Sequence, residues 1–147
     1  MNIKPTISRI VTGAFQVNTY IVSCPETKNG VIIDPGGDAK KIIALIKKNR
    51  IQIKYILNTH GHADHIAGIN LLRQAHPDIK VVIHKLDADM LTDSIANLSA
   101  MGGSFFKAEP ADIIIETEEI LNFASISLQV LHTPGHTPGG ISLYSQI

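Results

Sequence analysis

Three histidines and one aspartate lie within six positions of the sequence, in a segment spanning residues 59–65 that we call the histidine loop. They are His60, His62, Asp64 and His65. Imidazole nitrogen is a common ligand of zinc and iron, and carboxylate oxygen widens the choice of metal. Residues two positions apart in an irregular loop can direct their rings to one point, so we expect His60 and His62 to share an ion. Asp64 and His65 lie past the bend and are expected to serve a second, neighbouring ion.

A further histidine, His136, lies in a second loop, residues 132–140, which also follows a predicted strand. Ligand sites in sheets covered by helices favour the carboxyl ends of strands, so the two loops are expected to converge. His136 would then be a third nitrogen ligand, and three protein ligands with a water are typical of a catalytic zinc site. The alternative, a set of helix-capping residues, explains Asp64 alone but not three of the seven histidines within six positions. His76 and His84 are predicted to lie outside the site, whereas His132 could line it but is left out of the ligand set.

Predicted strands place both loops at strand ends. Short segments rich in Ile, Val, Thr and Tyr indicate strands, and the Asn-Gly pair at 29–30 predicts a hairpin turn. The segment 55–57 shows no alternation, which indicates burial on both faces. The predicted strands span residues 6–11, 18–23, 31–33, 55–57, 81–83, 126–131 and 141–144.

Two helices are predicted between these strands. Asp38 is expected to cap the first, which runs to about residue 49. The second is expected to begin at Asp64 or His65 and to end at Pro77, with four apolar residues facing the core: Ile66, Ile69, Leu71 and Leu72. The alternation of predicted strands and helices along the chain predicts a mixed or largely parallel sheet with helices packed outside.

The composition is typical of a single globular domain. Its 147 residues suffice for one core, and 13 basic residues balance 13 acidic ones. The zero net charge argues against a nucleic acid or an acidic membrane as partner. The single cysteine excludes an internal disulfide framework, no apolar run reaches the length of a membrane span, and no signal peptide is visible. We therefore expect a single domain over residues 1–147 in the cytoplasm.

Four segments of the chain resemble the signatures of one enzyme superfamily. Residues 59–68, T-H-G-H-A-D-H-I-A-G, resemble the T-H-x-H-x-D-H-x-x-G signature of the metallo-β-lactamase superfamily. Residues 18–22 resemble its early N-x-Y strand, residues 31–37 its I-D-P-G-G turn, and residues 131–139 its T-P-G-H-T-P-G loop. The pieces follow the family's order, and their wording is most similar to that of the glyoxalase II-like (hydroxyacylglutathione hydrolase-like) hydrolases.

This resemblance implies an αββα sandwich of the α/β (α+β) class, with a mixed sheet, outer helices and two metal ions at the sheet edges. His60, His62 and His136 match the ligands of the first ion, and Asp64 and His65 match ligands of the second. Zinc is the implied metal, as one or two ions, with iron or manganese as alternatives. The implied reaction is hydrolysis of a thioester such as the glutathione derivative S-lactoylglutathione by a metal-bound hydroxide, which Asp64 is expected to orient.

Two later pieces of the family pattern are not found in this sequence. Family members continue into a Gly-Asp segment whose Asp bridges both ions, and then to a final His; this sequence contains neither residue type after His136. We therefore expect only the N-terminal portion of the sandwich, with a two-ligand second site, a free strand edge and an uncovered apolar face. Both surface features favour a homo-oligomer or a domain swap.

Three functions remain open on the sequence. The leading hypothesis is a metal-dependent thioester hydrolase. The second is an iron-dependent persulfide dioxygenase of the same superfamily, and the third is a catalytically incomplete metal-binding fragment that needs another chain. β-Lactamase activity is disfavoured, because the Gly36-Gly37 turn and the second loop resemble the glyoxalase side of the family.

Overall fold

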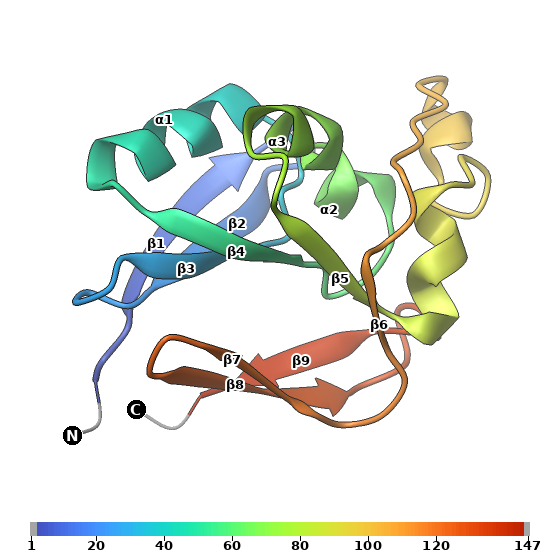
Figure 1. The fold of residues 1–147 in the computed structure, drawn as a ribbon. Coiled ribbons are helices and arrows are strands. Elements are labelled where there is room, and N and C mark those ends of the chain that lie inside the picture. Colours follow the sequence, from blue (N-terminus) through green and yellow to red (C-terminus); the bar gives the residue numbers. More distant parts are fainter. Residues whose placement is uncertain (1–2, 146–147) are drawn as a thin grey trace.

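Two β-sheets stacked face to face contain all the strands of residues 3–145, the part of the chain that the computed structural model describes (Figure 1). The first sheet has six strands in the order of the chain, and the second has three. The first sheet contains β1 (Thr6–Thr12), β2 (Val17–Ser23), β3 (Asn29–Ile33), β4 (Gln52–Leu57), β5 (Lys80–His84) and β6 (Ile113–Ile115). The second contains β7 (Ile120–Phe123), β8 (Ile126–His132) and β9 (Ile141–Tyr144).

The first sheet is mixed, as predicted. Strands β1, β2 and β3 pair antiparallel, whereas β3, β4, β5 and β6 pair parallel. Helices α1 and α3 cover its face opposite the second sheet (Figure 1). The helical segments are α1 (Ala39–Asn49), α2 (Ala63–Ile66), α3 (Ile69–Ala75) and the 3-10 helices η1 (Lys85–Leu91) and η2 (Ser99–Gly102). No helix among residues 3–145 is long and apolar enough to cross a bilayer.

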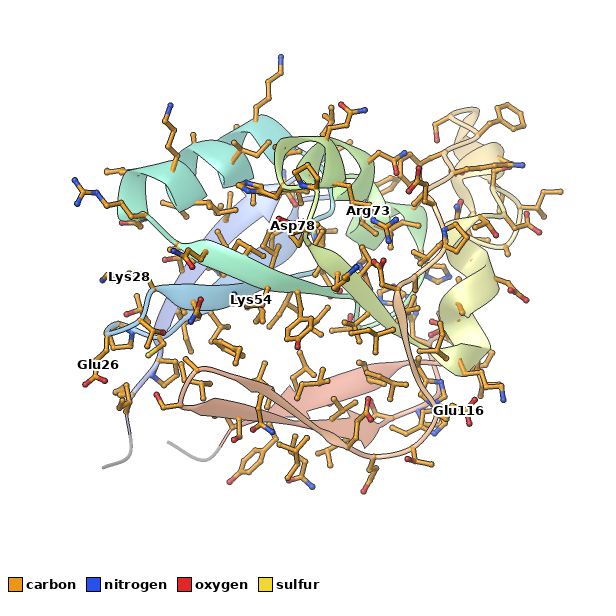
Figure 2. All side chains as sticks on the ribbon, in the orientation of Figure 1. Glu26, Lys28, Lys54, Arg73, Asp78 and Glu116 are labelled. Atoms are coloured by element: carbon orange, nitrogen blue, oxygen red, sulfur yellow. The ribbon has the colours of Figure 1, made fainter. Side chains whose placement is uncertain are left out.

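The core consists of two apolar clusters, one on each face of the first sheet. Along β3 and β4, Ile32 and Ile56 face the helices, while Val31 and Leu57 face the second sheet, and all four are fully buried. Figure 2 shows the side chains that fill the space between the two sheets. Burial on both faces explains why these strands have uninterrupted apolar runs, as predicted for residues 55–57.

The second predicted helix is divided into two short helices, which corrects the expectation of one continuous helix. The break falls at Gly68, whose N–H donates to the carbonyl of Pro35 at 2.7 Å. A Cβ atom at this position would lie 2.8 Å from the same oxygen. The close approach of the loop after β3 therefore ends α2. The break also changes which residues face inward, because Leu71, predicted to be buried, is 47% exposed.

Two predicted local features are also corrected. Asn29 and Gly30 begin β3 instead of forming the hairpin turn, which lies at residues 25–27. Asp38 occupies the N-cap position of α1 with a φ of 48° and makes no side-chain cap bond. Its carboxylate instead accepts a hydrogen bond from the backbone N–H of Gly13 at 3.0 Å. Asp38 thus ties the start of α1 to the β1–β2 turn.

The outer face of the second sheet is not covered by a helix within residues 3–145 (Figure 1). The expected uncovered face is mixed in character, because Ser127, Gln129 and Ser142 project outward beside apolar side chains. Ile120 and Tyr144 are its exposed large side chains, at 60% and 53%. The free strand edge is present, since β9 pairs with β8 alone in the described part of the chain.

Candidate metal centre

The two histidine-bearing loops meet at the carboxyl ends of two strands, one from each sheet. The histidine loop follows β4 and includes the first turn of α2, whereas the second loop joins β8 to β9. A backbone hydrogen bond joins the loops, because the Ile141 N–H donates to the Thr59 carbonyl at 2.9 Å. Within the second loop, the Thr133 N–H donates to the Gly140 carbonyl at 2.9 Å. The expected convergence is therefore present in the structure.

The first group of candidate ligands consists of His60, His62 and His136. One nitrogen from each ring lies within 4.8 Å of the others. The closest pair is His62 Nδ1 and His136 Nε2, which are 3.0 Å apart. Tetrahedral ligands with zinc–nitrogen bonds of 2.0–2.1 Å are separated by about 3.3 Å, so this spacing is close to that of a metal site.

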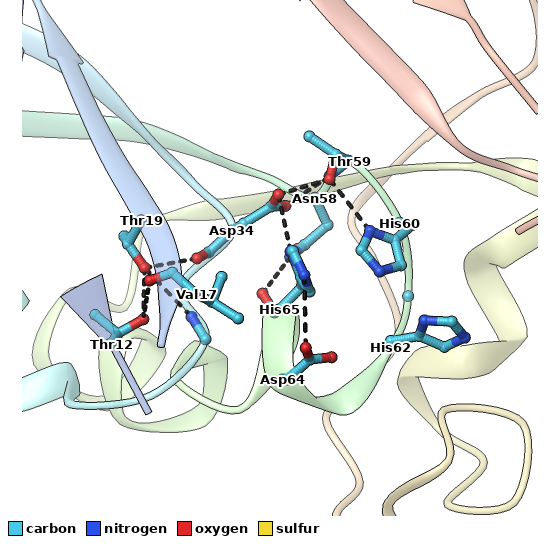
Figure 3. Close-up of polar contacts among 12 residues, drawn as sticks. Thr12, Val17, Thr19, Asp34, Asn58, Thr59, His60, His62, Asp64 and His65 are labelled. Carbon is cyan, nitrogen blue, oxygen red and sulfur yellow. Dashed lines mark hydrogen bonds and ion pairs between the residues drawn. The ribbon is translucent and has the colours of Figure 1, made fainter. Parts of the chain in front are cut away.

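The second group consists of His60, Asp64 and His65, and it shares His60 with the first. Asp64 and His65 are both on α2, and Asp64 Oδ2 lies 3.7 Å from His65 Nε2 (Figure 3). The His60 and His65 ring centroids are 4.1 Å apart. All five predicted ligands thus gather in one place, in two groups that have His60 in common.

His60 itself provides the test of whether these residues fit a metal ion. Its side chain is buried, and its Nδ1 lies 3.3 Å from the Thr59 hydroxyl. Its Nε2 is buried without a hydrogen-bond partner among the described residues. A buried polar atom without a partner costs free energy, and a metal ion at the meeting point of these rings would satisfy it. The donor set therefore fits a metal.

The protonation of His60 and His62 also suits metal binding. Burial, reinforced by the neighbouring His65, lowers the pKa of His60 to about 4. Burial and the nearby His136 likewise lower the pKa of His62. Histidine binds metals as the neutral imidazole. His60 is therefore in its ligand form at neutral pH.

Asp34 supports the second group from behind, a role that sequence reasoning missed. Its carboxylate accepts hydrogen bonds from the Thr59 N–H at 2.7 Å and from the Thr59 hydroxyl at 2.6 Å (Figure 3). The same carboxylate lies 3.1 Å from His65 Nδ1. Burial acts to lower the pKa of His65, but Asp34 and then Asp64 outweigh it, so the pKa is raised. A carboxylate at one ring nitrogen directs the other nitrogen toward the metal.

Asp87 on η1 is the second supporting residue that sequence reasoning missed. It is fully buried, and it accepts hydrogen bonds from the Gly61 N–H, the Thr137 hydroxyl and the Gly139 N–H at 3.1, 2.7 and 2.7 Å. Gly61 lies between the first two histidines, and Thr137 follows the third. Asp87 therefore joins the two loops. In sequence it lies near His84 and Asp89, but nothing in that segment marks it as a link between the two loops.

The remaining histidines lie outside both ligand groups. His84 stacks on His132 with ring centroids 4.2 Å apart and an interplanar angle of 10°. His132 Nε2 donates to the Pro138 carbonyl at 2.9 Å, which steadies the second loop. His76 is the C-cap residue of α3.

Fold and site together define a two-sheet α/β protein with a histidine- and carboxylate-rich metal centre at the strand ends. The chain belongs to the metallo-β-lactamase superfamily, whose profile matches residues 12–147. This confirms the family and the fold class inferred from the sequence.

Among curated relatives, the chain is 37% identical over 137 residues to a protein of Bacillus subtilis named "Probable metallo-hydrolase YqgX". It is 32% identical over 144 residues to the hydroxyacylglutathione hydrolase GloC of Haemophilus influenzae. These alignments cover 92% of this chain and 64% of each relative. It is also 32% identical over 125 residues to the human persulfide dioxygenase ETHE1, covering 84% of this chain and 41% of that protein. The chain thus spans less than two thirds of each of these relatives.

Two solved structures resemble the chain closely. The BLEG-1 B3 metallo-β-lactamase superposes with a TM-score of 0.89 at 35% identity, over 96% of this chain and 68% of that one. The protein TTHA1623 in a di-iron-bound form gives a TM-score of 0.73 at 32% identity, over 93% of this chain and 66% of that one.

Proposed function

We propose that this chain is the metal-binding part of a hydrolase that acts on thioesters such as S-lactoylglutathione. The observation that carries the proposal is the convergence of five ligand side chains from two loops around the unpartnered Nε2 of His60. The similarity to a hydroxyacylglutathione hydrolase supports the thioester class. Zinc is the proposed metal, as one or two ions, with iron or manganese as alternatives.

The proposed reaction adds water across the carbon–sulfur bond of the thioester. The carbonyl carbon gains the oxygen, the bond to sulfur breaks, and the thiolate leaves and takes up a proton. A bound ion supplies two effects: it lowers the pKa of water to about 7 and polarises the carbonyl.

The chain's own residues supply position and proton handling. His60, His62 and His136 would hold one ion, and Asp64 and His65 would contribute to a second. The side chain of Asp64 is 31% exposed, so its carboxylate can orient an attacking water by accepting a hydrogen bond from it. The proposal includes a cytoplasmic location for the protein.

Metal content and turnover of the same preparation test the proposal. We expect at least one zinc ion per chain and hydrolysis of S-lactoylglutathione, both lost in His60→Ala. His76→Ala is the matched control, because His76 lies outside the ligand groups, and it should retain both. Hydrolysis by a metal-free preparation, or full activity in His60→Ala, would contradict the proposal.

Two relatives favour specific alternative activities. The similarity to a persulfide dioxygenase predicts iron and oxygen uptake with glutathione persulfide. The 35% identity to a B3 metallo-β-lactamase predicts hydrolysis of a chromogenic cephalosporin. Assaying all three substrates with zinc-loaded and iron-loaded protein separates these activities, since each activity gives a different product.

The remaining alternative is an incomplete site that another chain completes. It predicts one ion or fewer per chain, negligible turnover, and a mass above that of the monomer from pairing at the free edge of β9 or from a domain swap. Light scattering combined with metal analysis tests it. A monomer with turnover rules it out.

A further inference from the structure

A pocket of about 400 Å³ lies beside the candidate metal centre. Its walls come from four segments that are distant in sequence: the β1–β2 turn, the loop after β3, α2 with the residue that follows it, and the segment after η2. The volume is within the range of about 300–1,000 Å³ that is typical of small-molecule sites. The lining residues are Thr12, Gly13, Ala14, Phe15, Gly36, Gly37, Ala63, Asp64, Ala67, Ser104 and Phe106.

This pocket is continuous with the metal centre through Asp64. Asp64 is at once a member of the second ligand group and part of the pocket wall. Ala63 and Ala67 flank it on the same side of α2. A substrate whose reacting carbonyl lies at the metal centre can therefore extend one of its two halves into the pocket.

The chemistry of the walls decides which half enters. The lining is dominated by Gly, Ala and Phe, and Asp64 is its one ionisable residue. A glutathione moiety carries carboxylates, and burying them without a cationic partner is costly. The lining contains no Lys, Arg or His side chain to act as such a partner. The thiol half is thus excluded, and an apolar acyl half is accepted.

Close backbone packing fixes two of the segments that line the pocket. Gly13 has a φ of +69°, and a Cβ atom there would lie 2.9 Å from the Gly36 carbonyl oxygen. A Cβ atom at Gly37 would lie 3.1 Å from the Cα of Gly13. Glycine is therefore required where the two loops cross. At the rim, the Phe15 side chain is 81% exposed and can close over a bound chain.

We propose that this pocket binds the hydrocarbon chain of the acyl group, so that the preferred substrates are thioesters of medium-length apolar acids. The inference rests on the proposed thioester hydrolysis and names its substrate class. A lactoyl group, with one methyl and a hydroxyl, would leave most of the pocket unfilled. Each CH₂ buried in the pocket should improve binding about two- to fourfold.

A binding experiment tests the pocket without relying on turnover. S-methyl, S-butyl and S-hexyl thioethers of N-acetylcysteamine cannot be hydrolysed and differ only in chain length. We expect calorimetry to give at least tenfold tighter binding for the hexyl compound than for the methyl compound. Amide chemical-shift changes should concentrate at Gly13, Gly37 and Ala67. Equal affinities, or shifts elsewhere, would overturn the inference.

Two substitutions that fill the pocket extend the test. Ala67→Phe and Ala14→Trp should each abolish the chain-length dependence, and Ala14 is in an exposed turn that tolerates a larger residue. Ala44→Phe, on the exposed side of α1, is the matched control and should leave it unchanged. Retained dependence in both folded pocket variants would overturn the inference.

Hydrolysis of acetyl, butanoyl and hexanoyl thioesters then separates the two proposals. A kcat/KM that rises with chain length supports both the hydrolase proposal and the pocket inference. Turnover that is independent of chain length overturns the pocket inference but leaves the hydrolase proposal intact. Chain-length-dependent thioether binding without hydrolysis of any thioester overturns the hydrolase proposal, and the pocket then remains an apolar-chain site.

Discussion

At the scale of single residues, the candidate site depends on two buried carboxylates as much as on its histidines. Asp34 contacts Thr59 and His65, and Asp87 joins the histidine loop to the second loop. Neither is a candidate ligand. Both fix the loops whose side chains would be ligands, and groups of this kind commonly change metal affinity by 10–100-fold when they are removed.

Asp87→Asn is expected to weaken both the fold and the metal site. The amide keeps one acceptor oxygen and replaces the other with a donor group, which would face either the Gly139 N–H or both the Gly61 N–H and the Thr137 hydroxyl. We expect a loss of about 2–3 kcal/mol in the free energy of unfolding and at least a tenfold loss of zinc affinity, measured by urea unfolding and chelator competition. Asp89→Asn, at an exposed position of the same 3-10 helix, should change neither. Unchanged zinc affinity in a folded Asp87→Asn protein would contradict the positioning role.

The lowered pKa of His60 predicts acid sensitivity of the metal-free protein. Above pH 6.5 the residue is neutral in both the folded and the unfolded chain and contributes nothing. Between pH 6.5 and the folded pKa of about 4, the unfolded chain binds a proton that the folded chain does not, so stability falls as the pH falls. The total loss is about 3 kcal/mol. In urea unfolding between pH 7 and 4, the free energy of unfolding should decline less steeply in His60→Ala than in the unaltered chain. Parallel declines in the two proteins would contradict the lowered pKa of His60.

At the scale of elements, the division between α2 and α3 shows what the sequence could and could not predict. The histidine loop, the second loop and the strands β1, β2 and β3 followed from local patterns, although the turn before β3 was misplaced. The break at Gly68 did not, because it depends on the carbonyl of Pro35, which is distant in sequence. Strands β6 and β7 were missed for a similar reason. β6 has three residues, too few for a periodic signal, and it is defined by its pairing with β5.

Gly68→Ala is expected to destabilise the protein although alanine is the better helix former. The helical gain is about 1 kcal/mol at most, whereas the new Cβ atom would lie 2.8 Å from the Pro35 oxygen. Overpacking of this kind costs about 1–3 kcal/mol, so the net effect should be a lower melting temperature. Gly102→Ala is the control, since nothing lies within 4 Å of its added Cβ atom. A more stable Gly68→Ala protein would show that the contact relaxes freely.

At the scale of the whole molecule, the candidate metal centre joins the two sheets. His60 follows β4 of the first sheet, and His136 precedes β9 of the second. An ion held by both would act as a cross-link between layers that also meet through apolar packing and through the hydrogen bonds of Ile141 and Asp87. Sequence patterns placed each loop at a strand end, but they could not show that the strands belong to different sheets.

Zinc should therefore stabilise the whole fold. A ligand that binds only the folded state at 100 times its Kd adds about 2.7 kcal/mol. We expect a higher melting temperature with zinc, reversed by a chelator, and a much smaller increase in His136→Ala. His76→Ala should respond like the unaltered chain. An equal zinc response in His136→Ala would mean that the second sheet does not take part in binding.

The hydrogen bond from the Ile141 N–H to the Thr59 carbonyl has a further consequence. This amide can exchange its proton with solvent only when the second loop separates from the histidine loop or when the whole chain unfolds. Its exchange rate therefore reports how often the centre opens. In deuterated buffer, slow exchange of Ile141 at the global rate would describe a preformed centre, and faster exchange that zinc suppresses would describe one that closes on its ion.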